Sequence, residues 1–265
     1  MTAWAPALVA LLAAGPGESP GPADGRTPVG PVPRVHVVAS DSLSPDALLA
    51  LARPEVTLWL NTTSNTLRAS TLERLPKFTR AWVEVHEPVR ALDSAQWKGF
   101  TRVGVWLTSP SVSAASIRRL GPRTVAASLV GALDEVAIAW LRSLHPAVVE
   151  WTPGAAPDLL AWSTLRSLTG ARRVWFRGQT EWPSGCEEGA VSVAAPLEAV
   201  LAKDALPFPC GRSPLLEISR TLDPELTDAV RSRYPGLEFL IRVGASEGDA
   251  FAAARFIKAL ESRSF

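Results

Sequence analysis

The chain contains few of the residues and motifs that carry metal or cofactor chemistry. Its three histidines are His36, His86 and His145, and they fall in separate segments. No Gly-rich phosphate loop, HExxH motif or paired CxxC motif is present. Because nothing in the sequence supplies a convergent set of metal ligands or a cofactor-binding motif, we expect no metal and no cofactor.

An excess of charge of either sign is also missing. The 27 basic and 26 acidic residues leave a net charge of +1 at pH 7, and the basic residues are mostly arginines scattered among acids. Proteins that bind polyanions usually carry a basic stripe or patch. We therefore expect no nucleic-acid partner.

Long apolar runs are limited to the N-terminus. Residues 2–14 (TAWAPALVALLAA) are apolar but too short to span a bilayer with ease, and Gly, Pro and other small residues follow them. This pattern resembles a secretory signal segment. We predict a signal peptide at residues 1–15, a Pro/Gly-rich linker at 16–33 and a single β/α repeat domain at 34–265. The protein would then be secreted or periplasmic, with no stable membrane span after signal removal.

Cysteine is scarce as well, and the two copies are Cys186 and Cys210. In an exported protein, an even number of cysteines often forms disulfides, so we predict a bond between Cys186 and Cys210. If the protein is not exported, two unpaired thiols are the alternative.

What the sequence does contain is a short β-branched run that returns at near-regular intervals. In residues 102–110 (RVGVWLTSP), the side chains alternate with the period of two that is typical of a β-strand. The comparable runs begin at residues 56, 81, 103, 125, 147 and 172, which are 22 or 25 residues apart. Weaker runs lie at residues 34–39, 190–195, 215–219 and 237–243. A fixed period of this length is typical of a repeat array.

Segments with helical spacing separate these runs. In residues 158–168, leucines and a tryptophan recur every three or four residues and so lie on one helical face. Ser44 followed by Pro45 is typical of a helix N-cap and first turn, and residues 249–260 suit a terminal helix that covers the last unit. Strands that alternate with helices indicate an α/β fold with a parallel sheet.

The apolar spacing ahead of two strands carries a resemblance to a known family. Residues 72–83 read Leu-x-x-Leu-x-x-Phe-x-x-Ala-x-Val, and residues 165–176 read Leu-x-x-Leu-x-x-Ala-x-x-Val-x-Phe. Both are similar to the leucine-rich-repeat pattern, and the similarity covers most of residues 45–243. It implies an open parallel β/α solenoid with the shape of a horseshoe. The alternative is a small (β/α)8 barrel, which typically needs eight units and about 250 residues.

In such a horseshoe, the outward strand residues would form the concave surface, where leucine-rich-repeat proteins generally bind protein partners. By alternation, this surface carries aromatic and charged side chains, namely Trp59, Trp82, Glu84, Trp106, Glu150, Arg173 and Trp175. Aromatic residues dominate binding hot spots, so we predict a non-enzymatic exported binding module for a protein or carbohydrate partner. The alternative is that a second layer covers the tryptophans and makes them core residues.

One enzymatic hypothesis also fits the sequence. Glu84, Glu150 and Glu217 occupy the same strand position at intervals of 66 and 67 residues. In a closed barrel, carboxylates such as Glu84 and Glu150 with aromatic neighbours would suit glycoside hydrolysis, in which paired acids serve as proton donor and nucleophile. In an open solenoid, the same glutamates would lie too far apart to act together.

Overall fold

A computed structural model describes the greater part of the chain. The described residues are 32–90, 95–98, 100, 102–152, 164–165, 167, 173–177, 191–196, 215–218, 224–233 and 236–264. The predicted signal peptide, nearly all of the predicted linker and the predicted disulfide between Cys186 and Cys210 lie outside these residues. They remain predictions.

Strands and helices alternate along the chain, and each of the ten runs expected to form a strand does so. The strands are β1 (Val35–Ser40), β2 (Val56–Asn61), β3 (Arg80–Glu84), β4 (Val103–Leu107), β5 (Val125–Val130), β6 (Val148–Thr152), β7 (Arg173–Arg177), β8 (Val191–Pro196), β9 (Leu215–Ile218) and β10 (Glu238–Arg242). The helices are α1 (Pro45–Leu51), α2 (Ala69–Leu72), the 3-10 helix η1 (Leu75–Lys77), α4 (Ala114–Arg118), α5 (Glu135–Leu144), α8 (Pro224–Arg233) and α9 (Glu247–Ser262). The prediction of an α/β fold is confirmed.

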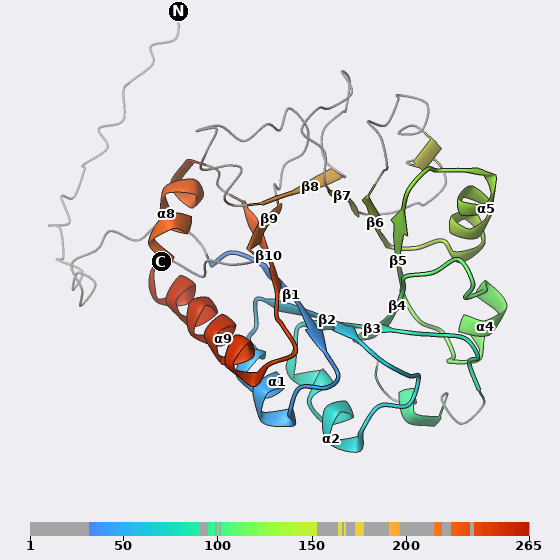
Figure 1. The fold of residues 1–265 in the computed structure, drawn as a ribbon, viewed down its shortest axis with the longest axis horizontal. Helices are drawn as coiled ribbons and strands as arrows, with labels where there is room; N and C mark the ends of the chain where they lie inside the picture. Colours follow the sequence, from blue (N-terminus) through green and yellow to red (C-terminus); the bar gives the residue numbers. More distant parts are fainter. Residues whose placement is uncertain are drawn as a thin grey trace, which may run out of the picture.

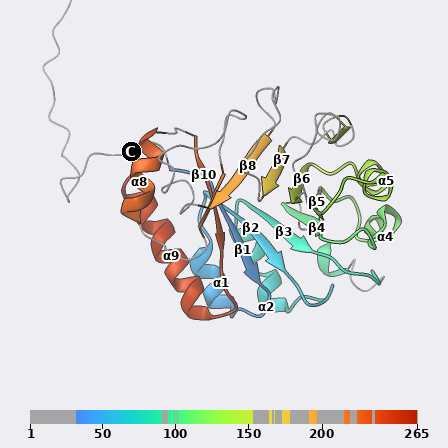
Figure 2. The same ribbon diagram turned by 45° about the horizontal axis from the view of Figure 1, so that its top comes forward.

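The sheet is parallel throughout and its two ends meet. Each described strand pairs with the strands before and after it in the sequence, and β1 also pairs with β10. Val37, for example, lies opposite Leu58 on one side and Ile241 on the other. Figures 1 and 2 show the helices on the outside of the ring of strands.

This closure corrects the expectation of an open horseshoe, in which the first and last strands would be the two free ends of the sheet. The structure agrees better with the alternative of a small β/α barrel, although ten strands rather than eight form the described ring. The repeat period could not distinguish the two, because both architectures use the same parallel strand and helix units. They differ in how far the sheet curves, and here it curves until β1 reaches β10.

The terminal helix packs across the position where the ring closes. Helix α9 contacts α1, so segments from opposite ends of the domain lie side by side (Figure 1). Its buried face includes Phe256, whose ring meets that of Phe239 on β10 edge-on at a centroid distance of 6.3 Å. The predicted terminal helix is confirmed, and it covers the junction of β1 and β10 rather than the free end of an array.

Local capping explains where several helices begin. Ser44 accepts a hydrogen bond from the backbone N–H of Ala47, and Pro45 follows as the first helical residue of α1, as predicted. Asp134 caps α5 in the same way through the N–H of Ala137. These caps orient the helices so that their apolar faces cover the outer side of the sheet. In the described part of the chain, no helix has the length and apolar character that a membrane crossing requires.

Where the structure describes the strand side chains, both faces of the sheet carry buried residues. Residues such as Val37, Leu58 and Val105 point outward into the large core beneath the helices. Their neighbours along the strands point inward and form a second apolar cluster, which consists of Val38, Trp59, Trp82, Trp106, Ala126, Leu215 and Leu240. We call this cluster the inner layer, and it lies in the interior of the barrel.

Candidate functional site

The strand face that carries the predicted binding residues is the inside of the barrel. Trp59, Trp82 and Trp106 are only 2%, 3% and 5% exposed. The prediction that they form an open binding surface is therefore wrong, and the alternative that they are core residues is correct. Closure of the sheet is the physical cause, because it turns a concave face into an interior. Arg173 and Trp175 lie on β7, and their side chains are outside the described part of the structure.

The three described tryptophans of the inner layer pack against one another. The Trp59 and Trp82 rings are stacked, with centroids 5.3 Å apart, and Trp106 meets Trp59 edge-on at 5.4 Å. Gly104 on β4 makes room for them, since a Cβ atom at this position would lie 2.5 Å from two ring carbons of Trp82. The tryptophans therefore connect β2, β3 and β4 through side-chain packing on the inner face of the sheet.

Beyond the inner layer, toward the carboxyl ends of the strands, the interior becomes polar. The Trp106 Nε1–H donates to Ser128 Oγ at 2.7 Å, and the Ser128 hydroxyl donates to Glu150 Oε2 at 2.7 Å. Arg242 then donates from Nη2 to Glu150 Oε1 at 3.4 Å and from Nε to Glu217 Oε1 at 2.7 Å. We call Ser128, Glu150, Glu217 and Arg242 the polar network.

The polar network joins strands that are not neighbours in the sheet. Arg242 is the last residue of β10, and Glu217 lies on the adjacent strand β9, but Glu150 lies on β6. The Arg242–Glu150 ion pair therefore crosses the barrel interior. The Glu150 and Glu217 side chains are 12% and 14% exposed and Arg242 is 33% exposed, so solvent reaches the guanidinium more than the carboxylates.

Glu84 is held by a separate set of partners. It ends β3, and its carboxylate accepts hydrogen bonds from the Thr62 backbone N–H at 3.1 Å and from the Thr108 hydroxyl at 2.7 Å. Thr62 and Thr108 directly follow the two neighbouring strands, β2 and β4. His86 Nε2 lies 3.8 Å from the same carboxylate. The Glu84 side chain is 12% exposed, so it faces a partly solvated space at the carboxyl end of the barrel.

The loop after β3 forms part of the rim around Glu84. The Asn65 side chain holds this loop, because its amide nitrogen donates to the carbonyl oxygens of His86 and Pro88 and its oxygen accepts from the His86 N–H. A hydrogen bond from Ser116, assisted by the Val89 backbone N–H, lowers the pKa of the Glu87 carboxyl in the same loop. A shallow pocket of about 300 Å³ lies between this loop and residues 63–66.

The two glutamates of the enzymatic hypothesis thus both face the carboxyl half of the barrel, but in different surroundings. Glu84 accepts from an amide and a hydroxyl, whereas Glu150 accepts from a hydroxyl and an arginine. Glu217, the third glutamate of the spaced series, joins Glu150 through Arg242. The regular spacing therefore did place the three carboxylates on the inner face.

The sequence prediction did not include Ser128 or Arg242 among the binding residues. Alternation places Ser128 on the same strand face as the glutamates, and it could have placed Arg242 there as well. Their pairing with Glu150 depends on the closed ring, which brings β10 opposite β6. Among the described residues, no group of three or more His, Cys, Asp or Glu side chains is arranged to hold a metal ion.

Comparison with known proteins adds no family to this description. No protein-family model matches the sequence, and no curated protein matches it.

Proposed function

We propose that the protein binds a carbohydrate at the carboxyl end of its barrel. The polar network is the observation that carries this proposal. The carboxyl end of the strands is the face at which β/α barrels place their ligands, and Glu84 and the network line that end here. Sugar hydroxyls can donate to the carboxylates of Glu84 and Glu150 and accept from the guanidinium of Arg242.

The balance of groups favours a sugar over an anion. Among the described side chains, this end carries three carboxylates, Glu84, Glu150 and Glu217, and the guanidinium of Arg242, which pairs with Glu150 and Glu217. Carboxylates attract hydroxyl donors and repel a second carboxylate or a phosphate. A neutral polyhydroxylated molecule therefore suits this surface better than a charged one.

The burial of the tryptophans favours a small ligand over a protein partner. The protein-binding hypothesis relied on tryptophans presented by an open face, but Trp59, Trp82 and Trp106 are buried. The partly exposed side chains are polar and lie inside the carboxyl end of the barrel. A single oligosaccharide chain can enter this end more readily than a folded protein can. Export of the protein remains part of the proposal and would place it where extracellular glycans occur.

A glycan array tests the proposal directly. We expect the labelled full-length chain to bind a defined class of glycans, and we expect Glu150→Gln to weaken binding to the best glycan at least tenfold by calorimetry. Glu135→Gln, at an exposed position in the first turn of α5, is the matched control and should change nothing. If no glycan binds above background, or if Glu150→Gln and Glu84→Gln both bind as tightly as the native chain, the proposal is wrong.

A second candidate function is hydrolysis of the bound glycan, and the contrast between Glu84 and Glu150 favours it. Glu150 has the Arg242 counter-charge, which suits a nucleophile or general base, while Glu84 accepts hydrogen bonds from the neutral Thr62 amide and Thr108 hydroxyl, which suits the proton donor. Proton donation to the leaving oxygen and attack at the anomeric carbon would then come from different sides of the barrel end.

The release of reducing ends from the best array glycan separates binding from hydrolysis. We expect Glu84→Gln and Glu150→Gln each to lower the initial rate by at least a hundredfold, with Glu135→Gln unchanged. A native chain that binds its glycan and releases no reducing ends would contradict hydrolysis and leave the binding function standing.

A further inference from the structure

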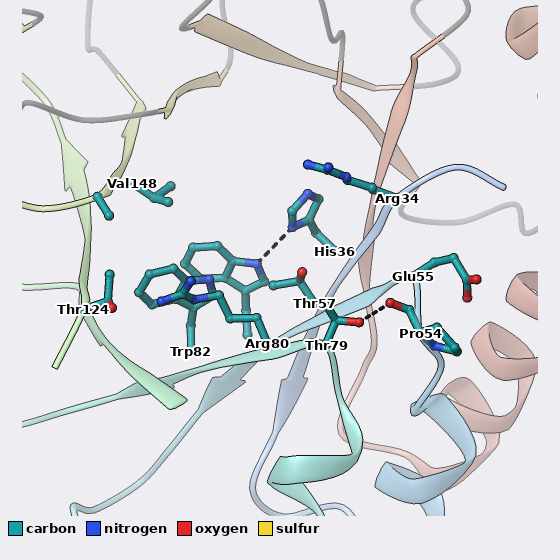
Figure 3. A pocket seen from close by; sticks show the side chains of 12 residues that line it. Arg34, His36, Pro54, Glu55, Thr57, Thr79, Arg80, Trp82, Thr124 and Val148 are labelled. Carbon is teal, nitrogen blue, oxygen red and sulfur yellow. Dashed lines mark hydrogen bonds between the residues drawn. The ribbon is translucent and has the colours of Figure 1, made fainter. Parts of the chain in front are cut away.

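A second pocket lies at the opposite end of the barrel, where the strands begin (Figure 3). Its volume is about 690 Å³, which is within the range of about 300–1,000 Å³ that small-molecule sites occupy. The residues that line it come from β1, β2, β3 and β6 and from the segments just before these strands and before β5. The inner layer lies between this pocket and the polar network.

Aromatic rings form one wall of the pocket. Trp59 and Trp82 both line it, but their rings stack on one another and are only 2% and 3% exposed, so they close this side of the pocket. The Arg80 guanidinium lies over the Trp82 ring, with its central carbon 4.5 Å from the ring centroid. This cation–π contact holds a positive charge beside the apolar wall.

A buried pair fixes the wall behind the tryptophans. His36 Nε2 lies 2.8 Å from Glu238 Oε2, and the Trp59 Nε1–H points to His36 Nδ1 at 3.4 Å. Since Nδ1 accepts from the indole, Nε2 carries the hydrogen and donates to the carboxylate. The His36 and Glu238 side chains are 7% and 5% exposed, so the negative charge of Glu238 is buried in the wall against the imidazole.

Two guanidinium groups face the remaining space. The Arg34 side chain is 73% exposed, and Figure 3 shows it extended over His36 toward the pocket. Glu55 also lines the pocket, but Figure 3 shows its carboxylate directed away from Trp82. Arg34 Nη1 lies 3.9 Å from Glu238 Oε1. The open part of the pocket therefore combines the positive charges of Arg34 and Arg80 with apolar contacts from Val148.

We propose that this pocket is a second binding site, which takes a small carboxylate with an apolar body. The carboxylate would meet the guanidinium groups of Arg34 and Arg80, which match its two oxygens in geometry. The apolar body would lie against Ala147 and Val148, where it loses contact with water. The beginning of the strands usually contributes stability in β/α barrels, and side chains that served packing alone would fill this space rather than line it with arginine.

Calorimetric titration of the full-length chain with 1-naphthoate tests the proposal, with 1-naphthamide as the neutral molecule of the same shape. We expect one saturable naphthoate site per chain and binding of the amide at least tenfold weaker. Arg34→Met and Arg80→Met should each weaken naphthoate binding at least fivefold. Arg118→Met, at an exposed position on α4, is the matched control and should bind like the native chain.

Two further variants distinguish a loss of naphthoate binding from a loss of folding. Val148→Phe adds bulk to the pocket without removing a charge, and we expect it to abolish naphthoate binding while the circular dichroism spectrum stays native. Glu150→Gln alters the other end of the barrel and should leave naphthoate binding unchanged. Absence of saturable binding, equal affinity for the amide, or full affinity in both arginine variants would overturn the proposal.

Discussion

The two ends of the barrel interior are made by the same strands, yet their chemistry is opposite. Strand β3 presents Arg80, Trp82 and Glu84 inward from its first residue to its last, so that it passes from a cation through an indole to a carboxylate. Strand β10 presents Glu238 at its beginning and Arg242 at its end, in the reverse order. The comparison shows that strand alternation determines which residues lie in the interior. Pairing with residues on other strands of the ring, as between Arg242 and Glu150, determines what each end can bind.

The inner layer separates the two ends. On β3 and β10, an apolar side chain of the inner layer occupies the middle inward position, whereas charged side chains occupy the first and last inward positions. Charges in the middle would have to be desolvated and paired. The barrel therefore has two polar ends that can be changed independently, and the following predictions test how independent they are.

The largest effect is expected from the inner layer itself. Trp59→Ala should lower the free energy of unfolding by about 3–5 kcal/mol, because the ring is 2% exposed and packs against both Trp82 and Trp106. Urea denaturation measures this loss, and Trp59→Phe should recover part of it. A loss below about 1 kcal/mol would be typical of a surface position and would show that the layer is not a packed core.

A smaller loss of stability is expected from a substitution at Gly104, where the backbone of β4 lies against the Trp82 ring. Gly104→Ala should cost about 1–3 kcal/mol, since the new methyl group would lie 2.5 Å from the Trp82 ring and 2.9 Å from the Thr124 carbonyl oxygen. Gly248→Ala in α9 is the matched control, because its Cβ would meet nothing closer than 3.8 Å. Combination with Trp82→Leu should reduce the cost of Gly104→Ala, and strict additivity of the two changes would contradict the proposed clash.

The polar network should contribute less to stability than either change above. Arg242→Met removes two ion pairs whose guanidinium is 33% exposed, so we expect a loss of about 1 kcal/mol that shrinks at high salt. Arg118→Met provides the baseline for losing an exposed arginine. If Arg242→Met also weakened naphthoate binding at the other end, the two ends would be coupled and the comparison above would fail.

The smallest effect concerns the contact of α9 with the segment before β2. Burial, and next the neighbouring Glu55 carboxylate, raise the pKa of Glu261 above its ordinary value of 4.5. A raised pKa of an acid means that the native state holds the proton more tightly, so stability is lost as the pH rises through the raised pKa. Glu261→Gln should therefore match the native chain in acid and exceed it above this range, by less than about 0.5 kcal/mol.

Thermal unfolding at a series of pH values measures this difference. Arg255→Gln, at an exposed position earlier on α9, is a control that removes a charge without changing the carboxyl pair. Equal pH profiles for the native chain and Glu261→Gln would show that Glu261 titrates alike in the folded and unfolded states.

Much of the local structure was predictable from the sequence because it depends on neighbouring residues. Period-two alternation located the ten strands, and Ser44 and Pro45 marked the start of α1. Alternation also placed Trp59, Trp82 and Trp106 on one face, and the spacing of Glu84, Glu150 and Glu217 placed the carboxylates on that same face. These inferences needed only the geometry of a strand and a helical turn.

The candidate sites were less predictable because their members are far apart in the sequence. Arg242 meets Glu150 across 92 residues, and His36 meets Glu238 across 202. Neither pairing follows from a repeat period, since the period describes one unit and its nearest neighbour. For the same reason, the sequence did not decide whether the tryptophans are buried or exposed.

The sequence by itself determined that strands and helices alternate, that the sheet is parallel and that one strand face is rich in tryptophan and glutamate. Only the tertiary structure decided that this face is an interior with two ends. Local patterns depend on backbone geometry within a few residues, whereas closure depends on the curvature added by every strand, which becomes definite only when β1 pairs with β10.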